Sequence, residues 1–141
     1  MKDKRSRARE LAMQALCQLD VQGSDILVWL GRFFEEHEAD EETRKLADRW
    51  SRRTWQHRGQ CDELIQSAAT KWRLERLSPV DRSILRLGAY QLKFCEKIPP
   101  RVAINESIEL AKTFSSEQSP RFINGVLDAV FKKLPERQTS G

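Results

Sequence analysis

The side chains best suited to chemistry in this sequence are basic and aromatic, and they gather in two stretches. Residues 2–9 read KDKRSRAR and carry five basic groups against one acid. Residues 119–128 read SPRFINGVLD and place Arg121 and Phe122 at the start of an expected helix. Basic side chains bind phosphates, and an aromatic ring stacks on an unpaired base. These residue types favour nucleic-acid binding, although a basic terminus can also be only a solvated, frayed end.

The helix expected from Ser119 has an unusual solvent face. Its apolar residues recur at i, i+3, i+4, i+7, i+8 and i+11, so they form one core-facing stripe of Ile123, Val126, Leu127, Val130, Phe131 and Leu134. Gly125 falls on the opposite face, with Phe122 beside it. Either another helix of the chain packs there, or a ligand comes close to the backbone. Phe122 can equally flank the core as a buried ring.

Residues that could carry catalysis or hold a metal are sparse in the sequence. His37 and His57 stand far apart, and neither has a second histidine or a cysteine at ligand spacing. The sequence contains no glycine-rich phosphate loop, no GxSxG and no dinucleotide fingerprint. Glu106 and Glu109 are interpreted as part of a solvated helix face. We therefore expect no enzyme activity, no metal and no cofactor.

Composition indicates one domain in a reducing compartment. The chain has 141 residues and a net charge of +4, from 25 basic and 21 acidic side chains. Cys17, Cys61 and Cys95 form no CxxC pair and are interpreted as reduced thiols. No signal peptide is recognisable, and no apolar run reaches the roughly 20 residues that a membrane span needs. We expect a cytoplasmic protein without a membrane partner.

Helical periodicity covers most of the chain, and no segment alternates like a strand. Start and stop signals divide the chain into helices. Gly23 ends the first helix, Ser24 caps the second, the acidic run 35–42 starts the third, and Gly59 marks a break before the fourth. Ser78-Pro79 starts the fifth helix, Pro99-Pro100 precedes the sixth, and Ser119-Pro120 starts the seventh. We predict one all-α domain, 1–141, of about seven helices in two small helical subdomains, 1–58 and 59–135, with a disordered tail at 136–141.

The same periodicity predicts which side chains face water. In the first helix, Arg5, Arg9 and Gln14 lie off the apolar stripe and should be exposed. The third helix should turn four arginines outward: Arg44, Arg49, Arg52 and Arg53. In the fourth helix, the inward stripe runs from Cys61 to Trp72.

Three stretches together resemble the NusB family of bacterial transcription antitermination factors: RARELAMQAL (7–16), LSPVDRSILRLGAYQL (77–92) and VAINESIELAKTFSSEQSPRFINGVLD (102–128). The resemblance implies an all-helical, non-catalytic protein that binds boxA RNA, chiefly of ribosomal RNA operons. It implies a heterodimer with NusE, a small-subunit ribosomal protein, acting on the RNA polymerase elongation complex with other Nus factors. Some relatives self-associate, so a homodimer stays open.

The resemblance also implies site residues. The RNA surface is built from the starts of the first and last helices, which we expect to come together as one basic platform: Arg5, Arg7, Arg9, Arg121, Phe122, Asn124 and Gly125, with Lys2 and Lys4 added on charge alone. An acid at the position of Asp81 takes part in NusE binding, with Arg82 and Arg86 near it; Asp81 also suits a capping box. Cys17, Gln118 and Pro120 depart from the common family pattern, which affects contact details.

Three other functions compete with this interpretation. NusB-like domains also precede RNA cytosine methyltransferase domains; because this sequence ends at residue 141, we expect a free-standing factor. A helical DNA-binding regulator would prefer duplexes to single strands. An enzyme with a helical cap is disfavoured by the missing site chemistry.

Overall fold

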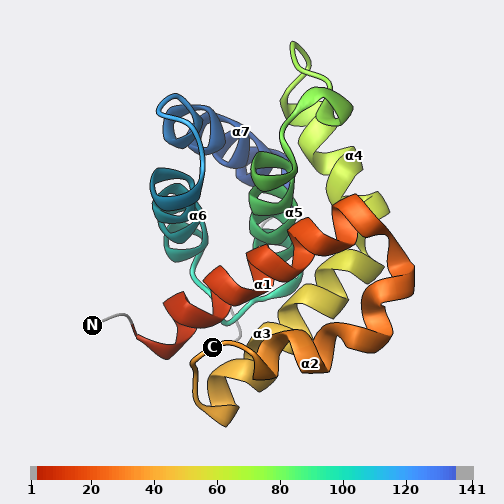
Figure 1. The fold of residues 1–141 in the computed structure, drawn as a ribbon. Coiled ribbons are helices and arrows are strands. Elements are labelled where there is room, and N and C mark those ends of the chain that lie inside the picture. The colour runs from red at the N-terminus through yellow and green to blue at the C-terminus, as the bar shows by residue number, and fades with distance from the viewer. Residues whose placement is uncertain (1–2, 136–141) are drawn as a thin grey trace.

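The computed structural model describes residues 3–135, most of which lie in helices (Figure 1). Within that range there is no strand, which confirms the predicted all-α class. The elements follow in this order: α1 (Lys4–Gln22), η1 (Ser24–Trp29), α2 (Leu30–Glu35), α3 (Glu41–Gln56), α4 (Arg58–Ala68), η2 (Leu74–Arg76), α5 (Pro79–Phe94), α6 (Pro100–Phe114) and α7 (Ser119–Lys133). Lys2 and the predicted tail, 136–141, lie outside the described residues.

Local capping explains where several helices begin. Asp3, Asp40 and Ser78 each accept a hydrogen bond from the backbone N–H three residues later, at 2.8, 2.8 and 3.1 Å. The last confirms the predicted Ser78-Pro79 start of α5. Gly23 ends α1 as predicted, with a φ of 89° that favours glycine over other residues.

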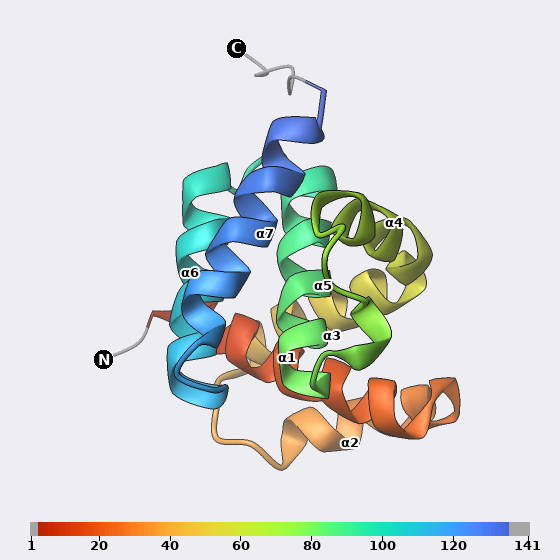
Figure 2. The same ribbon diagram turned by 90° about the horizontal axis from the view of Figure 1, so that it is seen from above.

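Helices α1 and α5 lie at the centre of the molecule. Helix α1 packs on α3 along one side and on α5 along the other, and α5 also contacts α4, α6 and α7. Figure 2 shows α5 between α4 on one side and α6 and α7 on the other. The buried side chains form one continuous core, which includes Leu11, Leu16, Ile84, Leu92 and Ile123. The division into subdomains at residues 58 and 59 stays a prediction.

An ion-pair network fixes the end of α1 against α4 and α5. Arg82 Nη2 lies 2.6 Å from Asp20 Oδ2, and Arg86 Nη1 lies 2.8 Å from Asp20 Oδ1. Arg86 also binds both carboxylate oxygens of Asp62, at 2.8 and 2.9 Å. All three helices are therefore held in one arrangement by largely buried charges, which become costly if a partner is lost.

The acidic run 35–42 starts α3 as predicted, with Asp40 as the N-cap and Glu41 and Glu42 in the first turn. Three other predictions about the helices need correction. Ser24 does not cap the second helix, because its hydroxyl accepts a hydrogen bond from the indole of Trp55 at 2.9 Å. The break before α4 falls at His57, two positions before the predicted Gly59. Helix α4 ends at Ala68, so Trp72 lies beyond it. Trp72 is exposed and is not part of an inward stripe.

None of the helices in the described range combines the length and apolar character that a membrane crossing requires. The three cysteines are free thiols. Burial raises the pKa of Cys61 to about 12 and raises that of Cys17, so both are held as neutral thiols near pH 7.

Candidate nucleic-acid interface

The start of α7 presents the predicted basic and aromatic residues at the surface. Ile123 is fully buried, and this fixes which way the first turn of the helix faces. Arg121, Asn124 and Gly125 are consequently exposed, while Phe122 is half-buried against the edge of the core. A Cβ at Gly125 would meet no neighbouring atom of residues 3–135 within 4 Å, so none of the described helices packs closely against this position.

A tryptophan from a different part of the chain lies beside Phe122. The rings of Trp72 and Phe122 meet edge to face, with centroids 5.4 Å apart and planes at 72°. This is a favourable geometry for aromatic pairs. Trp72 is 57% exposed, so a large part of this residue is open to solvent. The two rings therefore form an aromatic surface that can accept a base.

Gln66 holds the turn that carries Trp72. Its Nε2 donates hydrogen bonds to the carbonyls of Trp72 and Ala69, at 2.6 and 3.2 Å. Its Oε1 accepts a hydrogen bond from the N–H of Leu74 at 3.2 Å. One side chain thus satisfies backbone groups before, at and after Trp72. These hydrogen bonds fix the backbone that carries this exposed aromatic residue.

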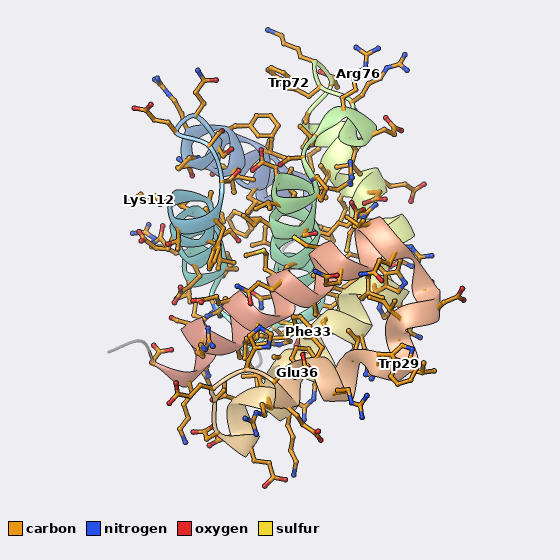
Figure 3. All side chains as sticks on the ribbon, in the orientation of Figure 1. Trp29, Phe33, Glu36, Trp72, Arg76 and Lys112 are labelled. Carbon is orange, nitrogen blue, oxygen red and sulfur yellow. The ribbon has the colours of Figure 1, made fainter. Side chains whose placement is uncertain are left out.

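Exposed basic residues are adjacent in sequence to both rings. Lys71, Arg73 and Arg76 are exposed in the segment from α4 to α5, where Glu75 is the one acid between residues 71 and 76. Figure 3 shows Trp72 and Arg76 at the same end of the molecule. Trp72, Arg73, Arg76, Arg121 and Phe122 are called the aromatic platform below. Such a combination suits a single strand, because rings stack on bases and cations bind phosphates.

The basic start of α1 is arranged differently from the prediction. Arg9 does not face water: it is 3% exposed, lies 5.1 Å from the Trp50 ring centroid and donates to Gln91 Oε1 at 3.1 Å. Its Nη1 also lies 3.6 Å from Glu106. Burial lowers the pKa of Arg9, and the charge of Glu106 opposes that shift. Arg9 is therefore a structural residue, because α3 and α5 flank α1 on two sides.

The other predicted residues of α1 are accessible to different degrees. Arg5 is exposed. Lys4 forms ion pairs with Asp40 and Glu42 at 3.2 and 2.9 Å. Arg7 is partly buried and lies 2.7 Å from Glu10. The acids at the start of α3 thus neutralise part of the charge that the sequence places here.

The starts of α1 and α7 do not come together. Ser6 in α1 donates a hydrogen bond to Glu106 in the middle of α6, at 2.6 Å. Ser119 at the start of α7 donates instead to Asp81 of α5, at 3.0 Å. Helix α1 therefore starts beside the middle of α6, whereas α7 starts beyond the end of α6 at Phe114. The expected single platform is therefore two separate basic surfaces.

The predicted partner-binding residues have internal contacts. Asp81 is half-buried and accepts hydrogen bonds from Ser115 and Ser119, at 2.6 and 3.0 Å. Its side chain thus joins α5 to the start of α7 rather than closing a capping box. Arg82 and Arg86 hold Asp20, as described above, and their side chains are 15% and 11% exposed. Their role toward a partner stays a prediction.

Sequence reasoning missed Trp72 because its position continues the spacing of the buried residues of α4. Two local signals distinguish it. Lys71 and Arg73 flank it, which is unusual for a core residue, and Gln66 can end a helix by bonding to the chain beyond it.

The arrangement of the seven α-helices in residues 3–135 is also found in known proteins. The sequence profile of the NusB family matches residues 6–132. The chain belongs to the NusB family. The transcription antitermination protein NusB of Symbiobacterium thermophilum is 44% identical over 138 residues, covering 92% of this chain and 90% of that protein. NusB of Anaeromyxobacter dehalogenans is 45% identical over 136 residues, with coverage of 96% and 95%.

Solved NusB structures share the fold. A NusB chain from T. maritima is 37% identical and superposes with a TM-score of 0.84 over 94% of both chains. A second similar chain comes from a crystal structure of antitermination factors NusB and NusE in complex with dsRNA. It is 26% identical, with a TM-score of 0.84 over 95% of this chain and 100% of that one. Family membership and fold therefore agree.

Proposed function

We propose that this protein is a cytoplasmic, non-enzymatic transcription antitermination factor that binds boxA-type single-stranded RNA together with NusE. In this role it acts on the RNA polymerase elongation complex at ribosomal RNA operons, with other Nus factors. The observation that carries the proposal is the aromatic platform. An open indole, a neighbouring phenyl ring and nearby arginines are the side chains that a single strand needs.

The two rings take different parts in binding. Trp72 offers the larger open face and would stack on a base, a contact that contributes about 1–3 kcal/mol. Phe122 is half-buried and would hold the indole in place through their edge-to-face contact. Arg121 and Arg76 would bind the flanking phosphates, and Gly125 leaves room for the strand to approach the α7 backbone.

Among the predicted residues of α1, Arg5 is best placed to contact a phosphate directly, because its side chain is exposed. Lys4 would have to exchange its acidic partners for RNA. Arg9 supports the fold instead. Binding of NusE at Asp81 would use the junction of α5 and α7, which lies directly beside the aromatic platform through Ser119. Binding of NusE would then change the affinity for RNA, and binding of RNA would change the affinity for NusE.

Fluorescence anisotropy with a labelled boxA-type RNA, in the presence and absence of NusE, tests this function. We expect NusE to tighten RNA binding by about tenfold, within the usual range of coupling between two sites. A scrambled RNA and a duplex DNA of equal length, used as competitors at fixed salt, serve as controls. The proposal is contradicted if NusE leaves the affinity unchanged, or if duplex DNA competes as well as boxA RNA.

A further inference from the structure

A second basic surface, distant from the aromatic platform, lies between α1, α3 and the end of α5. It is a groove with a volume of about 950 Å³. Its basic lining comes from three separate parts of the chain: Lys4 and Arg5 of α1, Lys45, Arg49 and Arg53 of α3, and Lys97 of the turn before α6. Three acids, Asp3, Glu42 and Glu96, also line it. The groove is therefore net positive, and we call it the α3 groove.

The acids of the groove neutralise only part of this charge. Asp3 already caps α1, and Glu42 pairs with Lys4 at 2.9 Å. Within residues 3–135, no carboxylate forms an ion pair with Arg49 or Lys97. These two cations extend from separate elements into the same groove and keep their binding capacity for an external anion.

The local structure explains why the cations gather there. Ala47, Trp50 and Thr54 turn the inner face of α3 to the core, so Arg49 and Arg53 share its outer face. They are four positions apart, which places their Cβ atoms about 5–6 Å from each other. The walls below them are apolar and include Tyr90, Phe94 and Ile98. This lining suits an extended anionic ligand with more than one charge.

We propose that the α3 groove binds the phosphate backbone of a second stretch of the RNA strand held by the aromatic platform. This inference rests on the proposed function. Guanidinium groups recognise phosphate better than a simple point charge does. A strand already bound at the platform reaches the groove at a high effective concentration, so weak additional contacts add measurably to affinity.

The length of α5 sets the spacing between the two sites. Asp81 lies beside the platform and Phe94 lines the groove. The helix between them rises about 20 Å, at about 1.5 Å per residue. A stacked strand that advances about 3.4 Å per nucleotide covers that distance in about six nucleotides, and a curved path over the surface takes more. An RNA of about 4 nucleotides spans only about 14 Å and therefore occupies the platform alone, whereas about 20 nucleotides reach both sites.

The test compares these two RNA lengths with the double variant Arg49→Gln/Lys97→Gln. The matched control is Lys112→Gln/Lys132→Gln, which removes the same charge from exposed positions on α6 and α7. For the long RNA, we expect the groove variant to bind about ten- to thirtyfold more weakly at 0.1 M salt, with the salt slope reduced by about 1.4, because each lost phosphate contact removes about 0.7. The groove variant and the control variant should bind the short RNA with the same affinity.

Phe122→Ala separates failure of this inference from failure of the proposed function. That variant should weaken both RNA lengths. If it weakens neither, the platform is wrong and the groove inference falls with it. If it weakens both while the groove variant matches its control on the long RNA, the groove inference alone is overturned. The groove inference is also overturned if the groove variant loses as much affinity for the short RNA as for the long RNA.

An acidic protein segment is the competing ligand for a basic groove. A 20-residue poly-glutamate peptide, added as competitor to the long RNA, tests for it. We expect the peptide to displace the RNA less well than an unlabelled RNA with the same number of charges. If the peptide displaces the long RNA as well as the unlabelled RNA does, and if the groove variant loses this displacement, the groove binds an acidic peptide. That result would contradict our proposal.

Discussion

The indole of Trp72 meets the phenyl ring of Phe122 edge to face, with their centroids 5.4 Å apart. The contact joins the turn after α4 to the first turn of α7. It makes a shared surface from two segments that are distant in sequence, and it orients the more exposed ring. The proposed RNA site consequently depends on a tertiary contact as well as on the composition of α7.

Gly125 provides a test of close approach to the α7 backbone. Gly125→Ala should stabilise the fold by up to about 1 kcal/mol, because alanine is a better helix former and the added Cβ meets no atom within 4 Å. If RNA approaches the backbone here, the same variant binds boxA-type RNA more weakly. Gly31→Ala in α2, where a Cβ is equally free, is the control and should leave RNA affinity unchanged. Thermal melting and anisotropy give both values; unchanged RNA affinity of Gly125→Ala would exclude a close approach.

Substitution of Gly88 by alanine should lower the stability of the fold, whereas the same substitution at Gly125 should raise it. A Cβ at this position would lie 2.8 Å from Leu127 Cδ1 and 2.9 Å from Ser107 Oγ. Both neighbours are buried, and the Ser107 hydroxyl already donates to the Ala103 carbonyl at 2.8 Å. Gly88→Ala should therefore destabilise the protein by about 1–3 kcal/mol, despite the better helix propensity of alanine. A urea midpoint equal to or above that of the wild type would show that α5, α6 and α7 are less closely packed than described.

Asp20 should contribute strongly to stability at neutral pH. Asp20→Asn leaves Arg82 without its carboxylate partner and should cost about 3 kcal/mol. Asp48→Asn, which breaks an exposed pair with Arg52, should cost less than about 1 kcal/mol. Chemical denaturation of both variants at pH 7 makes the comparison. Equal costs would contradict a structural role for the Asp20 network.

The same network predicts a specific acid response. Burial raises the pKa of Asp20, but hydrogen bonds and charges from Arg82 and Arg86 outweigh it, so the pKa lies below the ordinary value of 3.8. The stabilisation is present above the unfolded pKa and is lost as pH falls through the lower folded pKa, because the unfolded state binds the proton first. Asp20→Asn should therefore lose less stability than the wild type between pH 5 and pH 2. Parallel stability curves would exclude Asp20 as the cause.

Asp81 needs a test that separates partner binding from its internal hydrogen bonds. Asp81→Lys should abolish co-elution with NusE, whereas Ser119→Ala removes one of the internal hydrogen bonds without changing the surface charge. We expect Ser119→Ala to cost about 1 kcal/mol of stability and to retain NusE. If both variants lose NusE equally while remaining folded, Asp81 acts by positioning α7 and not by direct contact.

Much of the fold could be predicted from local patterns. The Ser78-Pro79 start and the stripe through Ile123, Val126 and Val130 depend on capping and on period 3.6, which are properties of a single helix. The Ser119-Pro120 start is correct to within one residue, although Ser119 bonds to Asp81 instead of capping α7. Such local features do not require knowledge of neighbouring helices.

The site depended on contacts that periodicity does not contain. Arg9 lies off the apolar stripe of α1, yet it is buried because two further helices flank α1. Trp72 lies on the spacing of the α4 stripe, yet it is exposed because Gln66 ends that helix with side-chain hydrogen bonds. A helical pattern shows which face is apolar, but it does not show which neighbour covers the other faces or where a side chain stops the helix.

The affinity of Trp72→Ala and Phe122→Ala for boxA-type single-stranded RNA tests the central claim most directly. Trp29→Ala is the matched control, because this tryptophan is similarly exposed but lies in η1, away from the aromatic platform. We predict that each platform variant binds about tenfold more weakly, as expected for a lost stacking contact, and that Trp29→Ala binds like the wild type. Circular dichroism confirms that each variant is folded. Wild-type affinity in both folded platform variants would contradict the proposed RNA site.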